Sequence, residues 1–327
     1  MKRVLGIGHA LVDLLIQMED DKLLKELGLP RGSMTLINEK EAEQIFHMVK
    51  SQNVPKASGG SAANTIHGLA SLGSPVGYIG KVQNDELGKF FENDLKQAGI
   101  DAKLYRGNAG TGHANTFISP DSERTFATYL GAAVEMKADE ISSEEFAPYH
   151  IVHIEGYLIY NTGLIEKAIR LAKANNMLVS LDLASFNVVE ENLEFLQSII
   201  PESIDIVFAN EEEAKAYTGK EPKEALELIA GQCKYAIVKT GKEGSYIKHN
   251  NEVTKIEIIE TTALDTTGAG DAYAAGFLHG LNLDLPMQKC GDLGALLAGT
   301  VIARYGARIY PEDLASVLER AKAIINN

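Results

Sequence analysis

The second half of the chain alternates short apolar runs with helical patterns, and this alternation restricts the fold more than any other feature. The runs at 150–156, 178–184, 205–210 and 235–241 are rich in Val, Ile and Leu and predict buried strands. A segment with helical spacing follows each of the first three runs. Strands that alternate with helices form βαβ units, whose parallel strands are covered by helices on both faces. The sequence therefore predicts an α/β fold built on a doubly wound, mostly parallel sheet.

Two stretches near the start of the chain do not fit the alternation. Residues 11–37 and 102–131 contain β-like pieces without the helices that βαβ units require. We expect them to form one small β lid on a single α/β domain that spans residues 1–327. The other expected elements are strands at 3–8 and 76–82, a hairpin at 244–259, and helices at 64–72, 85–99, 163–176, 192–200, 211–219, 272–281, 287–304 and 311–325.

Composition limits the partners and the compartment. The 327 residues carry a formal net charge of −14 and a pI of about 5.1, so the surface repels nucleic acid. No apolar run reaches about 18 residues, and His9 and Asp13 interrupt the apolar N-terminus, which argues against a membrane span and a signal peptide. Cys233 and Cys290 provide neither a disulfide framework nor a metal cluster and fit a reducing cytosol. We therefore expect a cytoplasmic protein with a small-molecule substrate.

The run "DTTGAGD", residues 265–271, places two glycines directly before an acid at the start of a helical pattern. Gly268 and Gly270 allow successive backbone N–H groups to converge, and the helix dipole adds positive potential. Such a nest binds phosphate oxygens or a developing oxyanion, and Asp271 stands where it could accept a proton from an attacking hydroxyl. The alternative is an ordinary glycine turn with Asp271 as a helix cap.

Three further stretches suit a ligand. In "SGGSAANT" the pair Gly59-Gly60 permits close approach of the backbone, and Asn64 can bond to sugar hydroxyls. In "NEEEA", Asn210 and Glu213 face one side of a helix start and suit Mg²⁺ held through water. "KTGKEG" is a glycine turn after a strand. The alternatives are, in the same order, a strand-to-helix turn, helix capping with a solvated acidic first turn, and a plain hairpin turn.

Several enzyme signatures are absent from the sequence. "GIGHAL" resembles a dinucleotide fingerprint, but Leu11 occupies the position of the third glycine. No G-x-x-x-x-G-K-[ST], HExxH or paired CxxC segment occurs, and the eight histidines show no metal-ligand spacing. These absences exclude a P-loop enzyme and the common zinc sites.

The order of the four stretches resembles the ribokinase/PfkB family of carbohydrate and nucleoside kinases. A first strand that ends in glycine is followed by Asp13, "GGSAAN", "NEEE", "KTGKEG" and "DTTGAGD", over essentially the whole chain. The resemblance implies a doubly wound α/β domain with a small β lid. It also implies transfer of the γ-phosphoryl group of ATP to a hydroxymethyl group with Mg²⁺, a reaction that depends on positioning and charge neutralisation.

The resemblance also implies a role for each matching residue. Asp271 looks like the catalytic base, beside an anion hole formed by Gly268, Ala269 and Gly270. The implied substrate contacts are Leu11, Asp13, Gly59, Gly60, Ser61, Asn64, Glu155, Tyr157 and Phe186. The implied ATP contacts are Asn210, Thr240, Gly241 and Gly244. Glu213 resembles a residue that holds Mg²⁺ through water, and Asp265 and Thr267 occupy the place where relatives bind a monovalent cation such as K⁺.

Two positions favour a nucleoside as substrate. Ribokinases have an N-x-D segment and a lysine inside the double-glycine motif, where this chain has Leu11 and Ser61, as adenosine kinases do. An apolar residue at position 11, with Tyr157 and Phe186 as aromatic neighbours, suits a nucleoside base, so adenosine is the favoured substrate. Glu155 points the other way, because ribokinases place a sugar-binding glutamate there.

Two other functions stay open from the sequence. One is a free-sugar kinase of the same family, acting on ribose, fructose or a sugar acid. The other is a non-catalytic binding or regulatory protein on this scaffold, against which Asp271 argues because a binder needs no base. The oligomeric state is open as well, since a lid with exposed edges either pairs with a partner's lid in a homodimer or stays a flap on a monomer.

Overall fold

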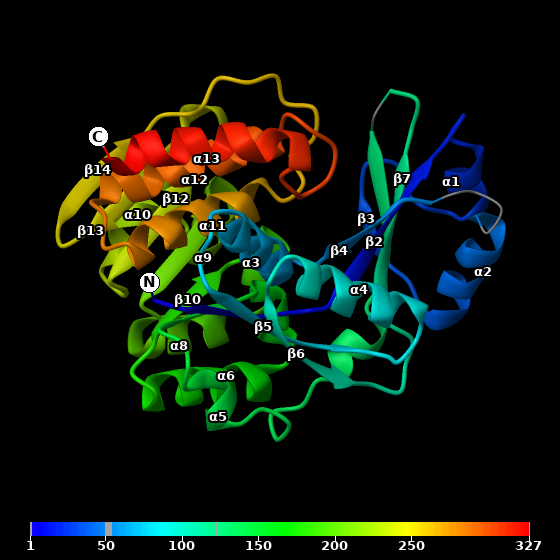
Figure 1. Ribbon diagram of the computed structural model, residues 1–327, viewed down its shortest axis with the longest axis horizontal. Helices are drawn as coiled ribbons and strands as arrows, with labels where there is room; N and C mark the ends of the chain where they lie inside the picture. The colour runs from blue at the N-terminus through cyan, green and yellow to red at the C-terminus, as the bar shows by residue number, and fades with distance from the viewer. Residues whose placement is uncertain (1, 50–53, 122, 327) are drawn as a thin grey trace.

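A nine-stranded sheet forms the centre of the computed structural model, which describes residues 2–49, 54–121 and 123–326 (Figure 1). In spatial order its strands are β14 (Glu252–Ile256), β13 (Ser245–His249), β12 (Tyr235–Lys239), β11 (Ile206–Asn210), β10 (Leu178–Asp182), β9 (Ile151–Ile154), β1 (Val4–Ile7), β5 (Val76–Val82) and β6 (Asp101–Arg106). Neighbouring strands are parallel from β12 to β6, and β13 and β14 continue β12 as antiparallel strands. The predicted α/β fold with a mostly parallel sheet is confirmed.

The chain winds outward from β1 in both directions. β5 and β6 extend the sheet on one side of β1, and β9 to β12 extend it on the other. Open α/β sheets bind ligands in the crevice beyond the carboxyl ends of the strands where the order reverses. The topology therefore predicts the site just beyond β1 and β9.

Helices cover both faces of the sheet. One face is covered by α3 (Ser61–Ser71), α4 (Glu86–Gln97), α11 (Ala269–Asn282), α12 (Met287–Val301) and α13 (Pro311–Asn326). The other is covered by α5 (Ser143–Phe146), α6 (Thr162–Ala174), α7 (Phe186–Glu191), α8 (Leu193–Ser203), α9 (Glu211–Thr218) and α10 (Pro222–Ala230). Strand side chains divide accordingly, since Phe208 of β11 packs toward the first set and Val207 toward the second. Among the described residues, no helix is long and apolar enough to cross a membrane.

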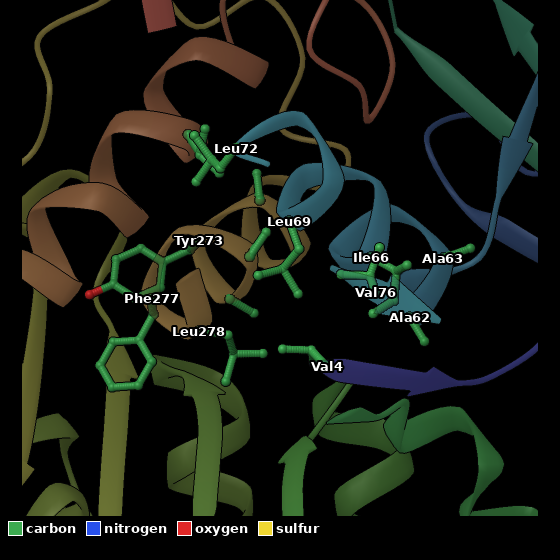
Figure 2. Close-up of a cluster of buried hydrophobic side chains, with 14 of the residues drawn as sticks. Val4, Ala62, Ala63, Ile66, Leu69, Leu72, Val76, Tyr273, Phe277 and Leu278 are labelled. Atoms are coloured by element: carbon green, nitrogen blue, oxygen red, sulfur yellow. The ribbon is translucent and has the colours of Figure 1, made fainter. Parts of the chain in front are cut away.

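The helices α3 and α11 pack against each other over the first strand. Figure 2 shows Ile66 of α3, Phe277 and Leu278 of α11, and Val4 of β1 in one buried cluster. Burial of such side chains contributes about 1.5–3 kcal/mol each relative to leaving them exposed. The packing holds the first turn of α3 near that of α11, and both turns carry polar residues.

A second, five-stranded sheet lies beside the main domain, at the right of Figure 1. Its strands are, in spatial order, β3 (Met34–Leu36), β8 (Arg124–Tyr129), β7 (Gly112–Ile118), β2 (Leu11–Gln17) and β4 (Lys56–Gly59). The helices α1 (Lys22–Glu26) and α2 (Glu39–Val49) pack on it through a separate apolar cluster. The sheet takes strands from both ranges predicted for the lid, and its action as a lid stays a prediction.

The predicted boundaries differ from the structure in three respects. β6 overlaps the start of the range 102–131 but pairs with β5 and so belongs to the main sheet. β4 lies outside both predicted ranges, yet it pairs with β2 and completes the second sheet. In addition, five helices, most of them short, were not predicted from the sequence: α1, α2, α5, α7 and α10. Two of them have an apolar spacing that identifies a helix: α2 at Ala42, Ile45 and Val49, and α10 at Ala225, Leu226 and Ile229.

The close packing of α11 on α12 depends on a glycine. A Cβ at Gly276 would overlap the carbonyl group of Leu293 on α12. We expect Gly276→Ala to lower the free energy of unfolding by about 1–3 kcal/mol, because overpacking a filled contact costs that much. Gly163→Ala is the matched control, because a Cβ at this helical glycine meets nothing within 4 Å. Chemical denaturation measures the difference, and an equally stable Gly276→Ala variant would contradict the packing.

Candidate active site

The carboxylate of Asp271 lies in the first turn of α11 but bonds to a different helix. Ser61 Oγ donates to Oδ1 at 2.7 Å and Asn64 Nδ2 donates to Oδ2 at 3.0 Å, both from the first turn of α3. Among the residues that the structure describes, no backbone N–H of α11 donates to this carboxylate. Asp271 is therefore not a cap of its own helix.

The environment of Asp271 makes it a suitable proton acceptor. Burial raises its pKa to about 6, against the hydrogen bonds from Asn64 and Ser61, which lower it. The charge of Asp182 adds to the rise, and that of Lys239 opposes it. A carboxylate with this pKa is ionised at pH 7 and still basic enough to take a proton during a reaction.

The backbone before Asp271 forms a concave turn that requires glycine. Gly268 has a φ of +73°, and a Cβ there would overlap Ala307. A Cβ on Gly270 would lie 3.0 Å from Nζ of Lys239, so this ammonium group stands beside the turn. A helix N-terminus and a lysine together create positive potential at one place, which suits phosphate oxygens.

Lys239 and Asp182 are site residues that the sequence analysis missed. They end β12 and β10, and Lys239 Nζ lies 3.2 Å from Asp182 Oδ2. The two side chains are only 16% and 10% exposed. A usable signal was present, because polar residues at the carboxyl ends of parallel strands meet at the same edge of a sheet.

Asp13 faces the double-glycine motif across two neighbouring strands. A Cβ on Gly59 would come within 2.5 Å of Asp13 Oδ2, and Gly60 has a φ of +95° that excludes most other residues. Burial raises the pKa of Asp13 to about 6, against the charges of Arg308 and Arg124. The motif thus brings backbone and carboxylate together, as a contact with a substrate hydroxyl requires.

Both carboxylate oxygens of Glu155 contact donors of the protein. Glu155 is 1% exposed, and its Oε1 accepts from the N–H of His9 at 3.2 Å and lies 3.0 Å from His9 Nδ1. Its Oε2 accepts from the N–H of Ala62 at 3.1 Å. These contacts tie the loop after β1 to the start of α3. At 1% exposure, the carboxylate offers almost no surface to a sugar hydroxyl in this conformation.

Three predicted substrate contacts present apolar surface. Tyr157, in the 3₁₀ turn η2 (Gly156–Tyr160), is half-buried, and burial together with nearby carboxylates raises its pKa to about 12. Phe186 is the first residue of α7 and is 42% exposed. Leu11 begins β2, where a Cβ on Gly112 would lie 2.6 Å from Leu11 Cδ2. Their exposed carbon atoms could cover a planar base.

Asn210 and Glu213 form a reciprocal capping box at the start of α9. The Glu213 N–H donates to Asn210 Oδ1 at 2.8 Å, and Asn210 N and Nδ2 donate to the Glu213 carboxylate at 2.8 and 2.6 Å. The capping alternative is therefore present. The acidic turn is not all solvated, however, because Glu213 is 2% exposed and its pKa rises to about 7, through burial and then through the charge of Asp182.

The pair of Asp182 and Glu213 fits Mg²⁺ held through water. Among the described residues no group of three His, Cys, Asp or Glu side chains could hold a metal ion directly. Mg²⁺ keeps several waters and binds mainly to substrate phosphates, so it needs only one or two protein carboxylates. Two buried carboxylates beside Lys239 provide such a place.

The turn after β12 is well ordered by its own contacts. Thr240 N and Oγ1 both donate to the carbonyl oxygen of Gly244, at 2.9 and 3.0 Å, around the 3₁₀ turn η3 (Gly241–Glu243). Gly241 and Gly244 have φ angles of +53° and +90°. The hairpin alternative is present, since the turn joins β12 to β13. Contact of this turn with ATP stays a prediction.

The predicted position for a monovalent cation is occupied by protein donors. Asp265 Oδ1 accepts from Thr267 N and Oγ1 at 3.1 and 2.8 Å. Its Oδ2 accepts from Gly306 N at 2.6 Å and lies 2.8 Å from Arg124 Nη1. A cation at Asp265 would have to displace the guanidinium group. These residues do not fit K⁺, and Arg124 supplies the positive charge instead.

Arg124 reaches the site from β8 of the second sheet and was also missed by the sequence analysis. It is 8% exposed, and its Nε and Nη2 have no hydrogen-bond partner within the described part of the chain. Its charge also lowers the pKa of Asp13. The guanidinium lies over the ring of Tyr305, 5.4 Å from its centroid, and brings positive charge to Asp265 and Asp13.

Comparisons with known proteins agree with this geometry. A family model described as pfkB family carbohydrate kinase matches residues 34–313. The adenosine kinase of Sinorhizobium meliloti is 36% identical, with a TM-score of 0.87 over 98% of this chain and 99% of that chain. The "probable sugar kinase protein" of Rhizobium etli CFN 42 is 32% identical, with a TM-score of 0.87 and 98% of both chains covered. The 5-dehydro-2-deoxygluconokinase of Listeria monocytogenes is 27% identical over 294 residues, 85% of this chain and 89% of that protein.

Replacing Asp271 by Asn should change how stability depends on pH. The folded pKa of about 6 lies above the ordinary 3.8, so the stability contributed by the protonated carboxyl group is lost as pH rises through about 6. The variant carries no such group, and we expect its unfolding free energy relative to wild type to improve by about 1–2 kcal/mol from pH 5 to pH 8. Denaturation at several pH values measures this trend. Asp284→Asn, at an exposed acid, is the control, and parallel profiles for wild type and Asp271→Asn would contradict the buried charge.

Proposed function

The chain belongs to the pfkB family of carbohydrate kinases, and from that premise we propose that it transfers the γ-phosphoryl group of ATP to the hydroxymethyl group of a nucleoside, with adenosine favoured. Family membership makes the protein an ATP-dependent kinase of a sugar or a nucleoside. The choice of a nucleoside and the role of each residue are our proposal.

Asp271 acts as the general base in this proposal. The substrate hydroxyl oxygen attacks the γ-phosphorus, its proton moves to the Asp271 carboxylate, and the bond from phosphorus to the β–γ bridging oxygen breaks to release ADP. The observation that carries the proposal is a buried carboxylate, held by Ser61 and Asn64, directly after an anion-binding turn. A carboxylate buried at such cost would serve no purpose in a protein that only binds, which argues against the non-catalytic alternative.

Backbone N–H donors and positively charged side chains would neutralise the charge on the phosphoryl group. The turn at Gly268 and Gly270 offers backbone donors, and Lys239 and Arg124 approach it from β12 and β8. Mg²⁺ on the ATP phosphates, held through water by Asp182 and Glu213, would add charge neutralisation when bound. Because Arg124 lies on the second sheet, that sheet contributes directly to the chemistry and not only to the exclusion of water.

The state of Glu155 supports a nucleoside over a free sugar. The carboxylate that could bind a sugar is engaged by protein donors, and Ser61, which replaces the lysine of ribokinases, bonds to Asp271. Leu11 and Tyr157, which are both partly exposed, would supply apolar surface to the base in this proposal. Each Å² of apolar base surface buried there contributes about 25 cal/mol, which a free sugar lacks. The 36% identity to an adenosine kinase supports the same choice.

A free-sugar kinase is the second candidate. The 5-dehydro-2-deoxygluconokinase of Listeria monocytogenes matches over 85% of this chain, and its name indicates a sugar-acid substrate. Asp13, Gly59 and Asn64, the proposed hydroxyl contacts, would serve either a ribose moiety or a sugar acid. The two candidates therefore share the reaction and differ in the part of the site that faces Leu11.

We expect Asp271→Asn to lower kcat by about 10²–10⁴, the usual contribution of a general base, because the amide cannot accept the proton. Steady-state ADP formation and a thermal melt together separate lost chemistry from lost fold. Asp284→Asn should keep the wild-type kcat. A near wild-type kcat for Asp271→Asn, with chemistry shown to be rate-limiting, would remove Asp271 from the mechanism.

Adenosine should be phosphorylated with a higher kcat/KM than ribose, fructose or 5-dehydro-2-deoxygluconate. The reason is the engaged Glu155 and the apolar Leu11. A coupled assay with Mg-ATP and this panel of acceptors measures the preference. Equal or better turnover of any free sugar would replace our proposal with the second candidate.

A further inference from the structure

Arg308 makes an unusual set of contacts in the loop between α12 and α13. Its Nε donates to Asn64 Oδ1 at 3.2 Å, and its Nη2 donates to Ser58 Oγ at 2.7 Å and to the Ser58 carbonyl oxygen. The side chain is only 20% exposed. We propose that Arg308 is a positioning residue, which orients the amide of Asn64 and through it the carboxylate of Asp271. This inference rests on the proposed function of Asp271.

The argument depends on the two different ends of an amide. Asn64 has an acceptor oxygen and a donor nitrogen, and a guanidinium group can only donate. Arg308 therefore requires the oxygen of Asn64 on its side, which turns Nδ2 toward Asp271 Oδ2 at 3.0 Å. In the opposite orientation the amide oxygen would face the carboxylate, and two acceptors would meet. Arg308 thus acts together with the Asp271 carboxylate to fix the orientation in which Asn64 supports the base.

The guanidinium group is itself held in place from two sides. Ser58 belongs to β4 and also donates to Asp94 of α4, whose Oδ2 lies 4.0 Å from Arg308 Nη2. His67, in contact with Ser58, is neutral at pH 7, because burial and the charge of Arg308 lower its pKa to about 2. Asp94 is therefore the charged partner of Arg308 on this side. The arginine joins the edge of the second sheet to α3 across the junction at Gly60.

A cavity beside the Asn64 amide bears on the role of Arg308. A space of about 250 Å³ is lined by Arg308, Asn64, His67 and Asp94, among others. Without the guanidinium, water in this space could bond to either end of the Asn64 amide, and only the Asp271 carboxylate would still favour the present orientation. The same loop touches the anion-binding turn, because Ala307 packs on Gly268. The loop thus aligns the base and the turn together.

Arg308→Met tests the proposal, with Arg304→Met as the matched control. Arg304 lies in the same loop, but its guanidinium pairs with Asp313 and is 42% exposed. We expect Arg308→Met to lower kcat roughly 10–100-fold, as small misplacements of catalytic groups do, with an unchanged KM for ATP. Arg304→Met should keep the wild-type values. ADP formation with the best acceptor of the panel is the assay, and an unimpaired Arg308→Met variant would overturn the inference.

A double-mutant cycle with Asn64→Ala identifies the route of the effect. If Arg308 acts through Asn64, the double variant should be no slower than Asn64→Ala alone. Additive losses would show that Arg308 acts elsewhere and would overturn the inference. If Asp271→Asn keeps a near wild-type kcat, both this inference and the proposed function are overturned. If Asp271→Asn is inactive but the losses in the cycle are additive, only the inference is overturned.

Arg308→Lys provides a second variant in case the Met variant does not fold. Lysine keeps the positive charge beside Asp94 but lacks the fork that reaches Asn64 and Ser58 at once. We expect its kcat to fall as far as that of the Met variant, with a wild-type melting temperature. Full activity of Arg308→Lys would show that charge alone suffices and would overturn the proposed orientation of the amide.

Discussion

The burial of the Asp271 carboxylate between α3 and α11 is the constraint on which the site depends. A buried carboxylate is costly unless it is hydrogen-bonded, and here the donors Ser61 and Asn64 come from a helix far away in the sequence. The two helices must therefore approach closely. Small residues allow this approach, since a Cβ on Gly68 of α3 would lie 2.6 Å from the Cβ of Ala275 on α11. The packing of α3 against α11 therefore also fixes the orientation of the Asp271 carboxylate.

A second feature is the pairing of two buried acids, Asp182 and Asp265, with cations from other elements. Asp182 meets Lys239 at 3.2 Å, and Asp265 meets Arg124 at 2.8 Å. The first pair joins β10 to β12 across β11, and the second joins β8 of the second sheet to the loop before α11. Buried pairs of this kind add little net stability, because the desolvation of both ions offsets their attraction. Both pairs hold positive charge close to the glycine turn before Asp271, where we propose that phosphate binds.

The comparison of sugar and nucleoside readings shows where sequence resemblance is insufficient. A glutamate at position 155 indicates a sugar site when residues are compared one by one. In the fold the same carboxylate bonds to His9 and Ala62 and holds the loop after β1 against α3. Ser61 likewise contacts Asp271 in this structure. The identity of a residue was visible in the sequence, but the group to which it bonds was not.

The sequence by itself determined the fold class and the positions of the glycine turns, because strand periodicity and the need for positive φ at Gly60, Gly244 and Gly268 act over a few residues. It also indicated Asp271 as a candidate base, because the glycine turn and the acid are adjacent. Only the tertiary structure decided which residues hold and surround that acid. Lys239, Arg124 and Arg308 had no local signature of comparable strength, since each acts on a partner brought near by strand order or by a loop. Interactions between distant segments depend on how the elements pack, and no short pattern encodes that packing.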